Sequence, residues 1–594
     1  MNLLPTPRSL KRRPGSFLLP KHGEAAINLI ESDAAPNHAS GYKLQIARHG
    51  IEITYRDTGG LWAAKATLRQ LRREYGRKLP CLAIRDWPDF IRRGVMLDVS
   101  RGRVPKVETL LDLAEKLADF KINELQLYTE HTFAYRNYKS VWQSWGALTA
   151  QDIRRLDTRC RELGIDLVPN QNSFGHLRYF LEHPRVRPLA EVAEPYEDAS
   201  GEFVRRPSTL APNHPGTLPF LRGLYGELLP NFSSHFFNVG CDETWDLGRG
   251  QSKKICKTKG KGTVYLDFLK RVQREVAKHG KRAMFWGDII LKYPKLIGKL
   301  PKDVVALNWG YEANHPFDQE TALFKKSGIP FYVCPGTSTW MTMVGKQDNA
   351  LKNLRRAASA GRKNGAIGYL ITDWGDGGHP QPLPVSWLPL ATGAAIAWNG
   401  RSINKASFFS ALSRDVFRDP SGKVVEAAWA LGMAHRKLHF NEANATPLGA
   451  VIAAPPPQER ELFCRNGLKY FTRIKARHIQ SAARELRRNI TALKKASRDP
   501  RISPGGKVLI RELELAARMA DQSCQFMLWQ QAVAGGEKSR ARSLATTNLA
   551  ALASVEKEFA TLWPRRNKGN TKHCSIFLQW RMADYRKFLR GTRT

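Results

Sequence analysis

The chain has 594 residues, with 94 Lys and Arg against 54 Asp and Glu, so its formal net charge is +40. This length predicts several domains, because a single hydrophobic core rarely grows so large. No run of 18 or more apolar residues occurs, so no membrane span is expected. The basic residues are spread over the whole chain without a recognisable nucleic-acid module, which argues against a dedicated nucleic-acid binder.

Residues 1–90 are predicted to form a small amino-terminal unit. Residues 1–23 are basic and punctuated by Pro, which indicates a loosely ordered lead-in. Residues 42–79 read as strands followed by a helix, the form of a small α+β domain. The first residues lack an apolar core of signal-peptide length, so a cytoplasmic location is expected unless the start is mis-assigned.

Residues 91–400 alternate short apolar runs with amphipathic helical patterns, the sequence form of repeated βα units. Eight such units predict an α/β fold, a closed (β/α)8 TIM barrel, with a long insertion at residues 182–218 between the third and fourth units. An open doubly wound sheet is the alternative. The strand candidates begin at Arg93, Ile122, Gly164, His235, Arg282, Val304, Pro330 and Ala366.

Residues 401–594 are predicted to form an all-helical domain, since apolar residues keep a helical spacing over 460–496 and 507–563. This domain is expected either to close one side of the cleft or to mediate homodimerisation. The eight cysteines are spread singly, and Cys81, Cys241 and Cys334 fall within or beside predicted buried strands. That placement favours free core thiols over a disulfide framework.

The segment FFNVGCDETWDLGRG sets Asp242 and Glu243 side by side after an apolar run, with Gly240 allowing the backbone to bend. Barrel enzymes carry their active sites at the carboxyl ends of the strands, so this pair is the predicted catalytic centre. The other strand ends are rich in aromatic and charged residues, as carbohydrate pockets are. These residues are Asp98, Arg101, Glu130, Asn172, His176, Trp286, Asp288, Trp309, Tyr311, Trp340, Trp374 and Asp376.

Taken in order, these motifs resemble glycoside hydrolase family 20, the β-N-acetylhexosaminidases. RRGVMLDVSRGRVP is similar to the family's first strand and implies that Arg101 grips the sugar. VPNQNSFGH implies that His176 lies near the catalytic acid, and FFNVGCDET resembles the Gly-x-Asp-Glu signature of Asp242 and Glu243. MFWGD, NWG and ITDWGD resemble the later strands, which supply aromatic walls and a sugar-binding acid. The residues implied are Trp286, Trp309, Trp374 and Asp376.

Three positions depart from the family pattern. The second strand ends in LYTEHTF where the family has a run of Asp, so Glu130 is assigned as the partner of His176. Asn238 stands where many members have His. No motif identifies the tyrosine that binds the acetamide, and Tyr311 and Trp340 are candidates by position.

The resemblance implies an exo-acting, retaining enzyme that uses the substrate's own acetamide as nucleophile. Glu243 would protonate the leaving oxygen, and Asp242 would orient the acetamide N–H while an oxazolinium ion forms. Apolar surroundings and the Asp242 charge would raise the pKa of Glu243 for this task. The expected partner is a small glycan or glycoconjugate ending in β-linked GlcNAc or GalNAc, and no cofactor is expected.

Two other functions fit the same residues. One is a barrel glycosidase in which a carboxylate attacks the sugar directly, and the other is a non-catalytic polyanion- or nucleic-acid-binding protein that keeps the barrel as a scaffold. The His and Cys residues are scattered, without His-Glu-x-x-His or Cys-x-x-Cys, so no metal is expected. A Gly-x-Ser-x-Gly nucleophile motif is also absent.

Overall fold

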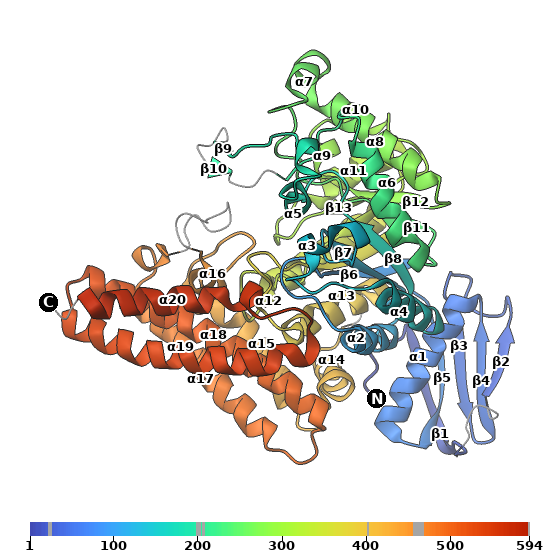
Figure 1. Cartoon of the computed structure of the whole chain (residues 1–594). Helices are drawn as coiled ribbons and strands as arrows, with labels where there is room; N and C mark the ends of the chain where they lie inside the picture. Colours follow the sequence, from blue (N-terminus) through green and yellow to red (C-terminus); the bar gives the residue numbers. More distant parts are fainter. Residues whose placement is uncertain (22–26, 198–202, 205–207, 401–402, 456–467, 592–594) are drawn as a thin grey trace.

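The computed structural model describes residues 1–21, 27–197, 203–204, 208–400, 403–455 and 468–591. At its amino-terminal end, drawn blue in Figure 1, five of the described strands form one sheet in the order β1-β5-β3-β4-β2. Helix α1 packs its apolar face on this sheet and shares a hydrophobic core with it. The bounds are β1 (Ser9–Leu18), β2 (Ile27–Glu31), β3 (Tyr42–Ala47), β4 (Gly50–Tyr55), α1 (Thr58–Tyr75) and β5 (Lys78–Asp86).

Strand β1 corrects the expectation of a loosely ordered lead-in. It pairs antiparallel with β5 from Ser9 opposite Arg85 to Leu18 opposite Lys78. Most of its side chains are exposed, so it lacks the apolar alternation that marks a half-buried strand. It lies at the edge of the sheet, where basic residues and a Pro at the register shift are tolerated.

Eight described strands close into a parallel barrel in the order β11-β12-β13-β14-β15-β6-β7-β8. The ring is completed where Asn238 of β11 stands opposite Asn170 of β8. This confirms the predicted TIM barrel, and the open doubly wound sheet is wrong. The strands are β6 (Arg92–Asp98), β7 (Glu124–Thr129), β8 (Asp166–Gln171), β11 (Phe236–Asn238), β12 (Arg282–Trp286), β13 (Val305–Trp309), β14 (Phe331–Cys334) and β15 (Gly368–Asp373).

Helices surround this barrel, and the long insertion follows β8. In the described part of residues 182–218, β9 (Tyr196–Glu197) and β10 (Phe203–Val204) pair as a short hairpin; residues 198–202 and 205–207 lie outside the described part. The principal outer helices are α2 (Val107–Asp119), α4 (Ala150–Glu162), α6 (Thr217–Leu228), α8 (Lys261–Ala277), α11 (Phe317–Ser327), α12 (Gln347–Asn364) and α13 (Trp387–Asn399).

The carboxyl-terminal part is helical, as predicted, and Figure 1 shows its long helices packed beside the barrel. Its buried side chains continue the barrel's own hydrophobic core. Of the helix expected over 460–496, residues 460–467 lie outside the described part and the helix itself begins at Ala476. The helices are α14 (Lys405–Leu412), α15 (Lys423–Met433), α16 (Pro447–Ala453), α17 (Ala476–Ser497), α18 (Pro504–Ala534), α19 (Lys538–Arg566) and α20 (Lys572–Gly591).

Seven cysteines fall in the described residues, and all of them are buried and free. Cys81, Cys241 and Cys334 are among them, which confirms the expectation of core thiols. Within the described ranges, none of the helices is both long enough and apolar enough to cross a membrane.

A buried carboxylate joins the small sheet to the barrel. Asp86, at the end of β5, accepts hydrogen bonds from Lys121 Nζ (2.8 Å), Trp398 Nε1 (2.9 Å) and Tyr42 Oη (3.0 Å). The Lys121 side chain is 1% exposed, and burial lowers the pKa of its amine. Asp86 therefore offsets the free-energy cost of burying the Lys121 ammonium group.

We expect Asp86→Ala to lower the free energy of unfolding by about 3–5 kcal/mol, because it leaves Lys121 charged and buried without its partner. Urea denaturation of the whole chain measures the loss. Glu115→Ala is the control: it removes an ion pair with Arg159 at the surface, where the two side chains are 53% and 39% exposed, and should cost less than about 1 kcal/mol. Equal losses in the two variants would contradict this role for Asp86.

Candidate active site

The predicted catalytic pair lies on a strained turn at the carboxyl end of β11. Gly240, Cys241 and Glu243 have φ angles of +67°, +66° and +45°. Left-handed backbone is costly for residues other than Gly and clusters at functional sites. Tyr265 Oη donates a hydrogen bond of 2.9 Å to the Cys241 carbonyl, so the fold around the barrel holds this turn in place.

Asp242 is 6% exposed. Its carboxylate accepts a hydrogen bond of 2.8 Å from Asn172 Nδ2, and its Oδ2 lies 3.2 Å from His176 Nε2. Burial raises the pKa of Asp242, but the His176 charge and the two hydrogen-bonding neighbours outweigh burial and bring the pKa below its usual value. Asp242 is therefore held as a carboxylate.

The pKa of Glu243 is shifted in the opposite direction from that of Asp242. Burial raises the pKa of Glu243, His176 opposes that rise, and the neighbouring Asp242 charge adds to it, so the pKa lies above its usual value. Its Oε2 lies 3.5 Å from His176 Nε2, and 26% of the side chain remains exposed. The two adjacent carboxyl groups therefore have pKa values displaced in opposite directions, an arrangement that suits an acid beside a carboxylate anion.

Glu130 contacts Arg101 more closely than it contacts His176. Glu130 Oε1 lies 3.9 Å from His176 Nδ1, but 3.1 Å from Arg101 Nη2, and it accepts a hydrogen bond of 3.0 Å from Tyr128. Glu130 therefore lies at ion-pair distance on the Nδ1 side of His176, while Asp242 is the nearer carboxylate, on the Nε2 side of the ring.

Arg101 is fixed by three carboxylates. Its Nη1 donates to Asp98 Oδ2 (2.9 Å), Nη2 lies 3.1 Å from Glu130, and Nε lies 3.7 Å from Asp376 Oδ1. Burial disfavours the charge, yet these anions raise the pKa of Arg101 well above its usual value. Burial also raises the pKa of Asp376 to about 6, against the pull of Arg101. The group can therefore offer both donors and acceptors to sugar hydroxyls.

Aromatic rings from four successive strand ends form one wall. Trp374 Nε1 donates to Tyr311 Oη at 2.7 Å. Tyr311 stacks on Trp309 at 5.1 Å and meets Trp340 edge-on at 5.0 Å, while Trp286 lies 5.9 Å from Trp374. Trp374 also lies beneath the Arg101 guanidinium at 5.2 Å. The aromatic wall and the charged cluster around Arg101 are thus in direct contact.

The structure adds partners whose roles were not predicted. Asp288 Oδ2 accepts the Glu243 backbone N–H at 3.2 Å. Burial, followed by the Asp242 and Glu243 charges, raises the pKa of Asp288 to about 8. Asn172 fixes Asp242, and Tyr128 fixes Glu130. Asp288 and Asn172 were visible at strand ends, but no sequence signal shows which atom each contacts. Among the described residues, no group of three or more His, Cys, Asp or Glu side chains is placed to hold a metal ion.

His176 makes stability depend on pH. Burial disfavours its charge, but Asp242 and then Glu243 outweigh burial and raise the pKa of His176 from 6.5 to about 9. Folded protein therefore binds a proton that an unfolded chain releases. This contribution, roughly 3 kcal/mol, is fully present below pH 6.5 and is lost as the pH rises through 9.

We therefore expect His176→Asn to be less stable than the wild type at about pH 6 and to approach it at about pH 10. Urea denaturation of both proteins at the two pH values measures the gap in unfolding free energy. Taking the difference between the proteins removes the pH dependence that they share. A gap that does not change with pH would contradict the assigned protonation of His176.

Ordinary retaining glycosidases hold two carboxyl groups about 5 Å apart on opposite sides of the scissile bond. Here the two carboxyl groups, Asp242 and Glu243, are consecutive residues at one strand end, beside an arginine and an aromatic wall suited to a pyranose. The molecule is a TIM-barrel protein whose strand ends carry a site with the composition of a carbohydrate-binding pocket.

Comparison with known protein families identifies the family of the chain. The model described as "Glycosyl hydrolase family 20, catalytic domain" matches residues 90–364, and that of "Glycosyl hydrolase family 20, domain 2" matches residues 20–87. Together the two models match more than half of the chain. The chain belongs to glycoside hydrolase family 20.

Individual relatives are distant. A beta-hexosaminidase of Vibrio furnissii is 26% identical over 341 residues, which cover 51% of this chain and 53% of the relative. A lacto-N-biosidase of Bifidobacterium bifidum is 24% identical over 300 residues, which cover 48% of this chain and 25% of the relative. The chain therefore spans about half of the first relative and a quarter of the second.

Solved structures share the fold. A beta-N-acetylhexosaminidase from Bacteroides fragilis superposes with a TM-score of 0.57 at 19% identity, covering 69% of this chain and 94% of that one. A chitobiase from Flavobacterium johnsoniae gives a TM-score of 0.59 at 17% identity and covers 92% of this chain and 96% of that one.

Proposed function

We propose that this protein is an exo-acting β-N-acetylhexosaminidase that removes a terminal β-linked GlcNAc or GalNAc with retention of configuration. The observation that carries the proposal is the consecutive pair Asp242 and Glu243, whose pKa values are displaced in opposite directions. Family membership and the beta-hexosaminidases among the relatives support it.

The reaction follows from that pair. The acetamide carbonyl oxygen of the substrate attacks C1 and the C1–O bond to the leaving group breaks, while Glu243 gives its proton to the departing oxygen. Asp242 accepts a hydrogen bond from the acetamide N–H and balances the positive charge of the oxazolinium ion. Water then attacks C1, gives its proton to Glu243, and restores the acetamide. A neighbouring His176 cation keeps Asp242 ionised throughout.

The other residues would bind the sugar. Arg101 and Asp376, 3.7 Å apart, would bind hydroxyl groups of the sugar, and the ring of Trp374 would cover its apolar face. Between the two positional candidates for the acetamide, Tyr311 is favoured because it carries a hydroxyl and Trp340 packs against its edge. The buried free thiols of the described residues also fit a reducing, cytoplasmic compartment.

Release of 4-nitrophenol from its β-GlcNAc, β-GalNAc and β-glucose derivatives tests the proposal. We expect turnover of the acetamido sugars and none of the glucoside, because glucose lacks the internal nucleophile. Comparable turnover of the glucoside would instead indicate direct attack by a protein carboxylate. Absence of turnover on all three would contradict the exo-acting activity proposed here.

A further inference from the structure

The segment Arg566–Cys574 comprises the last residue of α19, the turn that follows and the first residues of α20, and it lies against loops that follow the barrel strands. Its backbone pairs with the loop after β6. The Lys106 amide donates to the Arg566 carbonyl at 2.9 Å, and the Lys568 amide donates to the Val104 carbonyl at 2.7 Å. This connector thus extends the same loop that carries Arg101.

The connector also contacts the loop after β7, which begins at Glu130. The ring of His573 stacks on Trp145, with centroids 3.7 Å apart and planes 14° apart. Gly569 approaches so closely that a Cβ atom there would lie 2.2 Å from the Trp145 carbonyl oxygen. Lys568 Nζ donates to the Ala147 carbonyl at 3.1 Å.

A third contact joins the loops that carry Arg101 and Asp376. Gly102 has φ +107°, and a Cβ atom there would lie 2.7 Å from the Gly378 carbonyl oxygen and 3.1 Å from Cys574 Sγ. Cys574 Sγ donates to the Gly102 carbonyl at 2.9 Å. The beginning of α20 is therefore packed directly against the residue that follows Arg101.

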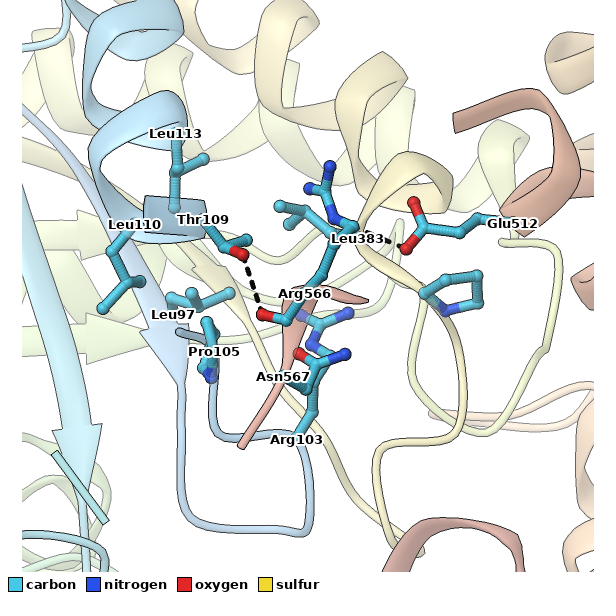
Figure 2. A pocket seen from close by; sticks show the side chains of 11 residues that line it. Leu97, Arg103, Pro105, Thr109, Leu110, Leu113, Leu383, Glu512, Arg566 and Asn567 are labelled. Carbon is cyan, nitrogen blue, oxygen red and sulfur yellow. Dashed lines mark hydrogen bonds and ion pairs between the residues drawn. The ribbon is translucent and has the colours of Figure 1, made fainter. Parts of the chain in front are cut away.

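The packing continues beneath this loop. Figure 2 shows a small cavity lined by Arg103 of the loop and by Glu512 and Arg566 of the helical domain, where Arg566 Nε lies 3.4 Å from Glu512 Oε1. Arg103 is buried and donates to the Gln381 carbonyl at 2.8 Å and to Asp373 at 3.1 Å. Thr109 holds the connector from the other side through the Arg566 carbonyl, at 2.7 Å (Figure 2).

We propose that the connector Arg566–Cys574 is a positioning element of the active site, which holds the loops of Arg101 and Asp376 in the geometry that binds the terminal sugar. The proposal rests on the function proposed above. Arg101 lies between carboxylates from three strand ends, so a small displacement of its loop breaks several contacts at once. Misplacement of binding groups by about 1 Å can reduce the rate on the order of 100-fold.

Gly569→Ala tests the connector, and Gly536→Ala is its matched control. Both residues have left-handed backbone, with φ +74° and +72°, so Ala imposes similar local strain at each. A Cβ atom at Gly536, in the turn between α18 and α19, meets nothing within 4 Å, whereas at Gly569 it meets the Trp145 carbonyl. Only Gly569→Ala should therefore push the connector away from the barrel.

Two measurements on the full chain decide the matter. Hydrogen exchange of residues 99–106 should become faster in Gly569→Ala and remain at the wild-type rate in Gly536→Ala. With 4-nitrophenyl β-GlcNAc, kcat/KM should fall on the order of tenfold or more in Gly569→Ala alone, mainly through KM. His573→Ala should behave in the same direction, and His573→Phe, which retains a stacking ring, should recover most of the loss.

Equal exchange rates in the two glycine variants would overturn the proposal, as would faster exchange with an unchanged kcat/KM. Failure of the proposed function gives a different result. In that case the wild type itself releases no 4-nitrophenol, and the exchange comparison still shows whether the connector holds the loop.

Discussion

Glu243→Gln should reduce kcat on 4-nitrophenyl β-GlcNAc by about 10²–10⁴-fold, because glutamine keeps the size of the side chain but cannot donate the proton. Burial, with the Asp242 charge, raises the pKa of Glu243 and so favours the protonated form that a general acid needs. The loss should be larger on chitobiose than on the nitrophenyl glycoside, since a sugar alkoxide needs protonation more than nitrophenolate does. Steady-state kinetics on both substrates measure this.

Glu320→Gln is the control for that variant. Glu320 lies on α11, pairs with His315 and is 22% exposed, close to the 26% of Glu243. Its activity should stay within about threefold of the wild type, because it is outside the charged cluster. A Glu243→Gln enzyme that kept more than about a tenth of the wild-type rate would contradict the assignment of the general acid.

The barrel could be predicted because parallel strands buried on both faces read as short apolar runs, and their polar ends stand out against them. In a closed parallel barrel the carboxyl ends of all strands lie on the same face, so the residues at those ends lie near one another. Strand β1 was not predicted, because backbone hydrogen bonds to β5 hold it in the sheet while its basic side chains face solvent. Such an edge strand lacks the alternation of apolar and polar residues from which strands are predicted.

The sequence predicts which residues lie at the strand ends better than it predicts which of them contact each other. Glu130 lies next to His131 in a motif that departs from the family, and only the folded geometry shows that it contacts Arg101. Asp288 reaches back to a backbone amide of Glu243. The connector at 566–574 contacts loops more than 400 residues earlier in the chain, such as that of Gly102. Contacts between distant segments have no local pattern from which they could be read.

Asp242→Asn should reduce kcat on 4-nitrophenyl β-GlcNAc by about 10²–10³-fold, the range seen when a group that stabilises transition-state charge is removed. The asparagine amide can donate where the reaction needs an acceptor for the acetamide N–H, and it carries no charge to balance the oxazolinium ion. The control is Asp348→Asn, which removes the carboxylate of another Asp–His pair, 2.8 Å from His435 and outside the site.

The same variant has a second, independent consequence, since Asp242 is the largest of the contributions that raise the pKa of His176. Without that charge, the pKa of His176 should fall from about 9 toward 6.5, which NMR titration of the imidazole can follow. A rate loss accompanied by this fall identifies Asp242 as the anion that serves both the acetamide and His176. An Asp242→Asn enzyme within about threefold of the wild-type rate would instead mean that the acetamide is oriented by another group, and the substrate-assisted mechanism would lose its main support.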